Sequence, residues 1–275
     1  KAGYESGGRK TVRVGLLIIG DEVLSGKIED KNSPHAAWRI RKAGYELGEV
    51  AVVQDDEDQV ASHVRRLSRA YDVVITSGGV GPTHDDVTIT AVAKAFGCGL
   101  RKDETLAAIL KKKSAGKKSL EKMTMVPESG RVLSMPGLDY PVLACHNVYV
   151  LPGVPQYFKQ KLDAILASME SRPSLKARRL SHKKLLLSSS DESLYAKKLE
   201  EIDRKSSGVK IGSYPQVPRA DCKAVITVEG EGEEAVDRAV EALRKALPKD
   251  AVVGVESGDN LLSPIERKPC DAPSA

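Results

Sequence analysis

The 275-residue sequence predicts a three-layer α/β domain, a mostly parallel sheet with helices on both faces, followed by a small α+β domain. Before residue 170, apolar runs of strand length alternate with helical periodicity, and the connections are short, as in repeated β-α-β units. After residues 171–177 (SRPSLKA) the order changes to strand, helix, strand, strand, helix, strand, which is typical of a ferredoxin-like arrangement. We therefore expect a lead-in, two domains and a tail at residues 1–11, 12–170, 178–256 and 257–275.

The first domain opens with a nearly continuous apolar run at residues 12–19, which is typical of a strand buried on both faces. A helix is expected to begin near Ser33, capped by Asn32 or Ser33, and to end at Gly44. The same criteria predict further strands at 46–53, 73–76, 131–135 and 142–151, and helices at 57–70, 86–96, 103–113 and 155–169.

The second domain contains helices with one apolar face. In the last of them, Ala239, Ala242 and Leu243 recur at helical spacing among charged residues. The expected strands are 179–187, 209–214, 222–229 and 251–255, and the expected helices are 191–205 and 232–246.

Composition limits the classes of partner. Aromatic residues make up only 4% of the chain, which weighs against base stacking and therefore against a nucleic-acid partner. No stretch approaches the roughly 18 apolar residues of a membrane span, so we expect no membrane partner. The net charge of +5 comes largely from clusters at 111–118 and 182–184, which form either solvated faces or a rim that attracts anions.

The four cysteines lie far apart and form no CxxC pair, which predicts neither a zinc site nor a disulfide framework. A reducing compartment fits this pattern best, and we expect a cytoplasmic protein. The first residue is Lys rather than Met, so an organelle location stays open if a targeting segment has been removed.

Residues 77–86 (SGGVGPTHDD), which we call the glycine loop, follow a strand and precede a helix. Backbone amides at such a turn, with the positive end of the following helix, bind phosphate or carboxylate oxygens. Glycines also serve tight turns that bind nothing. The polar groups of the loop favour binding, because a bare turn does not need them. The predicted binding residues are Ser77, Gly78, Gly79, Gly81, Thr83 and Asp85.

Carboxylates follow several strands of the predicted sheet. Asp85 and Asp86 are either first-turn helix residues or metal ligands, because acidic groups beside a phosphate cradle repel the anion unless a cation lies between them. Asp55 or Asp56, after the second strand, supplies a second ligand or a helix cap. Other loops bring further residues to the same edge of the sheet. Asp21 and Glu22 are predicted catalytic carboxylates, and Asn32 and the turn residue Gly153 are further predicted binding residues. This convergence predicts a divalent metal, Mg²⁺ first, with Mn²⁺ or Co²⁺ as alternatives.

Four segments together resemble the molybdopterin-binding, MoaB/Mog-like domain, and within it the branch found in CinA-type proteins and eukaryotic FAD synthases. These segments are GDEVLSGKIEDKN (20–32), VVQDD (52–56), TSGGVGPTHDDVT (76–88) and LPGVP (151–155). The resemblance covers residues 12–170, and KIGSYPQV (210–217) is similar to the small domain that follows in CinA-type proteins.

The resemblance implies a MoaB/Mog-like fold assembled as a homo-oligomer, with a small nucleotide or pterin as substrate. Members that act in molybdenum-cofactor synthesis transfer an adenylyl group to molybdopterin with Mg²⁺. Relatives of the CinA and FAD synthase type are associated with metal-dependent hydrolysis of pyrophosphate bonds in FAD or ADP-ribose. Functional acidic positions of the family match Asp55 and Asp86 in this sequence.

Our leading hypothesis is metal-dependent hydrolysis of a nucleotide pyrophosphate such as FAD or ADP-ribose. Glycines of the loop would hold the pyrophosphate, and Asp55 and Asp86 would hold the metal, with Asp21 and Glu22 completing the acidic site. The alternatives are a molybdopterin adenylyltransferase and a non-catalytic module that binds nucleotide or molybdopterin. FAD synthesis itself would need a further domain or subunit.

Overall fold

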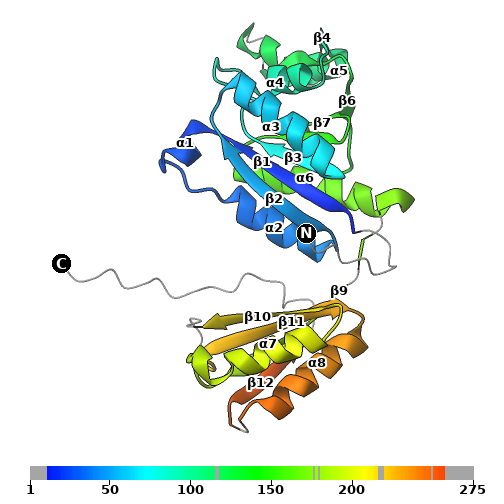
Figure 1. The fold of residues 1–275 in the computed structure, drawn as a ribbon. Coiled ribbons are helices and arrows are strands. Elements are labelled where there is room, and N and C mark those ends of the chain that lie inside the picture. The colour runs from blue at the N-terminus through cyan, green and yellow to red at the C-terminus, as the bar shows by residue number, and fades with distance from the viewer. Residues whose placement is uncertain are drawn as a thin grey trace, which may run out of the picture. The chain divides into compact units, whose positions relative to one another are not determined.

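The computed structural model describes residues 11–114, 118–175, 177–178, 180–215, 220–248 and 250–257. The chain divides into two compact units, Lys1–Ala177 and Arg178–Ala275 (Figure 1). The predicted lead-in before residue 11, the predicted tail beyond residue 257 and part of the lysine cluster at 111–118 lie outside the described residues. No helix in the described ranges is long and apolar enough to span a membrane.

The first unit is built on a six-stranded sheet in the order β2-β1-β3-β8-β7-β6. Strands β2, β1, β3 and β8 are parallel neighbours, whereas β7 runs antiparallel to both β8 and β6. The strands are β1 (Arg13–Ile19), β2 (Glu46–Val53), β3 (Val73–Ser77), β6 (Gly130–Leu133), β7 (Val142–Cys145) and β8 (Val148–Leu151). The predicted mostly parallel sheet is therefore confirmed.

Helices cover both faces of this sheet, which confirms the three layers (Figure 1). On one face, Leu16 of β1 belongs to a core with residues of α2 and α6, and on the other face Leu17 belongs to a core with residues of α3 and α4. Because both faces are buried, β1 shows no alternation of polar residues. The helices are α1 (Asp21–Leu24), α2 (Asn32–Lys42), α3 (Glu57–Ala70), α4 (Thr88–Ala95), α5 (Glu104–Ser114) and α6 (Pro155–Glu170).

Several local predictions were wrong. The strand expected at 142–151 is a hairpin that turns between β7 and β8, where His146 has a positive φ of 52°. The helix expected from residue 86 begins at Thr88, because the two aspartates before it belong to the loop. Neither Asn32 nor Ser33 caps α2: Lys31 is the N-cap residue, and Oδ1 of the preceding Asp30 accepts from the amides of Asn32 and Ser33 at 2.9 and 3.0 Å.

A short two-stranded sheet, made of β4 (Leu100–Lys102) and β5 (Met125–Pro127), was not predicted. A 3₁₀ helix, η1 (Lys118–Thr124), precedes β5 along the chain. Together with α5, these elements form a layer beyond α4. The short strands carry no periodicity long enough to be recognised.

The second unit has the predicted element order. Its strands form an antiparallel sheet in the order β10-β11-β9-β12. Its core joins buried residues of the sheet, such as Leu185 and Ile226, to Val236 and Leu243 of the last helix. The elements are β9 (Leu180–Leu187), η3 (Glu192–Leu194), α7 (Ala196–Lys205), β10 (Val209–Pro215), β11 (Ala224–Glu231), α8 (Glu233–Ala246) and β12 (Val252–Ser257).

Candidate functional site

The predicted polar residues gather where β1, β2, β3 and β8 end, and we call this the strand-end edge. These strands are parallel, so their carboxyl ends meet at one edge of the sheet, which is where α/β domains bind ligands. Asp21 follows β1, Asp55 follows β2, the glycine loop follows β3 and Gly153 follows β8.

Gly78 begins the turn against the end of β1. Its φ is +114°, and a Cβ on it would lie 2.0 Å from the carbonyl oxygen of Ile19, so no other residue fits without movement of the backbone. Gly79 has a φ of +61°, and a Cβ there would lie 2.4 Å from Oγ1 of Thr88. The buried Thr88 fixes this turn, because its amide donates to the Gly79 carbonyl at 3.0 Å and its hydroxyl donates to the Gly78 carbonyl at 2.8 Å.

Only part of the predicted glycine cradle has free donors. The Gly78 amide donates to the carbonyl of Leu151, and the Gly81 amide donates to Asp86. For the amides of Gly79 and Val80, no acceptor is found among the residues that the structure describes. These two amides are therefore the ones that an anion can use.

Asp86 closes the glycine loop with its carboxylate. Oδ1 accepts from the Gly81 amide at 2.6 Å, and Oδ2 accepts from the amide and hydroxyl of Thr83 at 2.8 and 2.5 Å. Lys122 adds a hydrogen bond from Nζ to the Thr83 carbonyl at 2.5 Å. Both oxygens of Asp86 thus accept hydrogen bonds within the loop, so a metal ion bound by Asp86, as predicted, would have to share an oxygen with one of these donors.

Of the two adjacent acids after β2, Asp55 faces the site and Asp56 does not. Asp56 caps α3, since its Oδ1 accepts from the Gln59 amide at 2.8 Å. Asp55 accepts from the Asp21 amide at 2.9 Å and lies close to Gly79, where a Cβ would be 3.5 Å from its Oδ1. The residue pattern alone left this choice open, whereas the family resemblance matched Asp55, and it is Asp55 that lies at the strand-end edge in the structure.

Burial raises the pKa of Asp55 above its ordinary value, and the negative charges of Glu22, Asp21 and Asp85 raise it further. The hydrogen bond from the Asp21 amide opposes this only in part. Acidic side chains from the loops after β1 and β3 therefore act on Asp55 across the strand-end edge. Among the residues that the structure describes, no opposing charge returns the pKa of Asp55 to its usual range.

Asn32 and Ser77 lie beneath the glycine loop. Nδ2 of Asn32 donates to Oγ of Ser77 at 2.9 Å and to the Gly153 carbonyl at 2.8 Å. The two side chains are buried, with Asn32 at 6% and Ser77 at 1% exposure. They join α2 to the ends of β3 and β8, so in this structure these predicted binding residues support the loop, whereas Thr83 and Asp85 are exposed.

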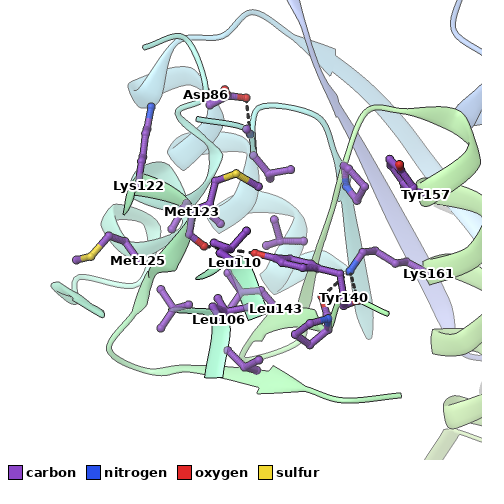
Figure 2. A pocket seen from close by; sticks show the side chains of 18 of the residues that line it. Asp86, Leu106, Leu110, Lys122, Met123, Met125, Tyr140, Leu143, Tyr157 and Lys161 are labelled. Carbon is purple, nitrogen blue, oxygen red and sulfur yellow. Dashed lines mark hydrogen bonds between the residues drawn. The ribbon is translucent and has the colours of Figure 1, made fainter. Parts of the chain in front are cut away.

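An apolar cavity of about 540 Å³ adjoins the loop and was not predicted (Figure 2). Val80, Gly81 and Asp86 line it at the loop end. Most of its wall is apolar and comes from α4, α5 and the segments at 123–126 and 137–143. The apolar wall includes Ile89, Leu106, Leu110, Met123, Met125, Val126 and Leu143.

Lys161 of α6 is the buried cation of this cavity. It is 8% exposed, and Nζ donates to the carbonyls of Tyr140, at 2.9 Å, and Pro141. Its Nζ also lies 5.2 Å from the centre of the Tyr140 ring. Burial lowers the pKa of Lys161 to about 8. One signal was available in the sequence, because Lys161 falls on the apolar stripe of its helix, three residues after Phe158 and four before Ile165.

No group of three His, Cys, Asp or Glu side chains in the described ranges is placed to share a metal ion. Among the described cysteines, Cys98, Cys145 and Cys222, the structure contains no disulfide bond, and Cys270 lies outside the described residues. Any cation at the strand-end edge would therefore take few protein ligands.

Comparison with known proteins covers both units. The family model described as "Probable molybdopterin binding domain" matches residues 15–176, and the model "FAD synthase, middle domain" matches residues 181–256. A "Probable FAD synthase" of Caenorhabditis elegans is 33% identical over 87% of this chain and 50% of its own length. A "CinA-like protein" of Geobacter metallireducens is 30% identical over 80% of this chain and 56% of its length.

The chain thus spans about half the length of these curated relatives. Among solved structures, a CinA protein of Thermoplasma acidophilum is 32% identical, with a TM-score of 0.51, over 58% of this chain and 96% of that one. The first family model alone covers more than half of the residues, and it includes every loop of the strand-end edge. The chain belongs to the family of molybdopterin-binding domains, in a form related to FAD synthases and CinA-like proteins.

Proposed function

We propose that this protein hydrolyses the pyrophosphate bond of a dinucleotide such as FAD or ADP-ribose, with a divalent cation. The observation that carries the proposal is the position of Asp55 beside the glycine turn. Burial and the negative charges of nearby carboxylates raise its pKa, and a bound cation would supply the positive charge that offsets them. Free amides at Gly79 and Val80 are suited to phosphate oxygens, and the neighbouring carboxylates are suited to a cation.

The residues present fit a divalent cation of the Mg²⁺ type. Such an ion commonly takes one or two carboxylates, with waters and substrate phosphates completing its shell, rather than a cage of protein ligands. A site with Asp55 and one of Asp21, Glu22 or Asp85 meets that need, although no three acidic side chains in the described part of the chain converge on one point. A bound cation there would neutralise charge on the pyrophosphate and activate the attacking water.

The chain's own groups perform the remaining steps. The Gly79 and Val80 amides would hold one phosphate and orient the bond to be cleaved. Asp86 keeps the loop in the shape that presents those amides, because it accepts from Gly81 and Thr83. A second acidic side chain, Asp21 or Glu22, would accept a proton from water as general base. With FAD, water adds to one phosphorus and the products are FMN and AMP.

The test is incubation of the purified chain with FAD or ADP-ribose and Mg²⁺, Mn²⁺ or Co²⁺, with chromatographic detection of AMP. Asp55→Asn should lose at least about a hundredfold in rate, because it removes a charge that the cation needs. The matched control is Asp56→Asn, since asparagine also caps helices and this side chain points to α3. Absence of AMP with every metal would refute the proposal.

The family model itself favours a second candidate, a molybdopterin adenylyltransferase. Such a transfer would use the same amides and cation but ATP as donor and molybdopterin as acceptor. Release of pyrophosphate from ATP that depends on added molybdopterin would select it. Tight binding of nucleotide or molybdopterin without turnover would instead select a non-catalytic binding module.

A further inference from the structure

We propose that the apolar cavity beside the glycine loop binds the flavin ring, and that Lys161 donates a hydrogen bond to a carbonyl on its pyrimidine edge. The choice of a flavin ligand rests on the proposed function, which puts FAD among the substrates. The placement of the ring rests on the cavity alone. Four observations carry the inference: the position of the cavity next to the free amides, its volume, the chemistry of its lining residues, and the buried ammonium group of Lys161.

The cavity and the free amides are continuous. Val80 provides one of the amides without an acceptor and also lines the cavity, together with Gly81 and Asp86. A substrate whose phosphate lies at the Gly79 and Val80 amides would therefore have one of its two halves directed into the cavity. The volume, about 540 Å³, is in the range of roughly 300–1,000 Å³ in which proteins enclose small ring systems.

The walls divide into an apolar part and a polar part. Figure 2 shows Lys161 and Tyr157 entering from one side, with Tyr140 beside Lys161, and Met125 on the opposite side. Leucine and methionine side chains line the apolar part, and the polarisable sulfur atoms of Met123 and Met125 can contact an aromatic ring. The flavin ring has the same division, with a dimethylbenzene end and a pyrimidine end that carries two carbonyl oxygens.

Lys161 supplies the polar recognition. An ammonium group has three donors, and two of them go to the carbonyls of Tyr140 and Pro141. The third has no acceptor among the described residues, although the side chain lines the cavity and is almost fully buried. A buried donor without a partner is costly, and a ring carbonyl would satisfy it. Adenine has no carbonyl oxygen and is too small to fill both parts of the cavity.

Protonation of Lys161 should control this contact. A neutral amine has two hydrogens, both already engaged by the backbone carbonyls, and would turn a lone pair toward the ring carbonyl. The other titratable groups that line the cavity are Asp86, Lys122, Asp139, Tyr140 and Tyr157. Asp86 and Lys122 hydrogen-bond within the glycine loop. Asp139 is exposed, and Tyr157 is 53% exposed.

The experiment measures riboflavin binding to the full chain by quenching of flavin fluorescence, without metal. Riboflavin contains the ring but no phosphate, so the measurement does not depend on hydrolysis. Adenosine is the competing ligand, measured by calorimetry. We expect riboflavin to bind, Lys161→Met to weaken it about tenfold to a hundredfold, and affinity to fall as pH rises through about 8. Lys159→Met, on an exposed position of the same helix, should leave affinity unchanged.

Adenosine binding in place of riboflavin would overturn the inference, as would riboflavin affinity that responds neither to Lys161→Met nor to pH. The pH titration of the wild-type chain keeps the test valid if the variant fails to fold. Riboflavin binding without any FAD hydrolysis would refute the proposed function and support the ring site. Hydrolysis of FAD without riboflavin binding would refute the ring site alone.

Discussion

Lys161 makes a prediction about stability that needs no ligand. The ordinary lysine pKa is 10.5, and burial lowers that of Lys161 to about 8 in the folded chain. Between these two values the unfolded chain binds one more proton than the folded chain, so the free energy of unfolding rises with pH. From a pH of about 7 to one of about 9.5, the two pKa values give a rise of about 2 kcal/mol from this residue.

The perturbation is Lys161→Met, which removes the titrating group. Its absolute stability is not the readout, because the carbonyls of Tyr140 and Pro141 lose their donor. The readout is the free energy of unfolding of the wild type minus that of the variant, measured at each pH. This difference should rise by about 2 kcal/mol between pH values of about 7 and about 9.5.

Urea unfolding followed by tryptophan fluorescence suits this measurement, since the single tryptophan, Trp38, lies in the first unit with Lys161. Lys159→Met is the matched control, and it should keep the wild-type dependence on pH because its side chain is exposed. A difference between wild type and Lys161→Met that stays constant across the range would show that the buried amine does not titrate there, and the reasoning would be wrong.

Three further predictions concern the strand-end edge. Gly78→Ala should lower the free energy of unfolding by more than about 3 kcal/mol. Gly153→Ala should lower it by about 1 kcal/mol or less, because a Cβ there would meet no atom nearer than 3.4 Å. Equal urea midpoints of the two variants would contradict this prediction. Mg²⁺ at a hundredfold excess over its Kd should stabilise the wild type by about 2.7 kcal/mol in thermal unfolding, and Asp55→Asn should abolish that gain. Asp86→Asn should lower the free energy of unfolding by about 1–3 kcal/mol, because it weakens the hydrogen bonds from Gly81 and Thr83. This variant should still be stabilised by Mg²⁺. If Mg²⁺ no longer stabilised it, Asp86 would instead be a metal ligand.

Sequence periodicity predicted the layers and the parallel sheet. A long apolar run such as that of β1 indicates a strand buried on both faces, and a parallel sheet covered by helices on both sides contains such strands. Periodicity could not separate Asp55 from Asp56, since adjacent acids after a strand are equally suited to capping. Only the start of α3 assigns Asp56 to the Gln59 amide and leaves Asp55 at the site.

The cavity could not be predicted for a different reason. Its apolar wall combines residues from α4, α5 and the segments at 123–126 and 137–143, and these apolar residues resemble ordinary core in their own segments. Their meeting depends on the small sheet of β4 and β5, whose strands are too short to leave a periodic signal. Lys161 was the one indication, as a charged residue on an apolar stripe.

The layer formed by α5, η1 and the two short strands has a consequence for how such a chain can diversify. The loops at the ends of β1, β2 and β3 provide the amides and carboxylates, while α5 and the segments at 123–126 and 137–143 shape the adjoining space. Substitutions in the second set, at Leu106 or Met125 for example, would change which ring fits in the cavity without altering the glycine loop. Under the proposed function, selectivity and chemistry would thus be encoded in separate stretches of sequence, free to vary independently.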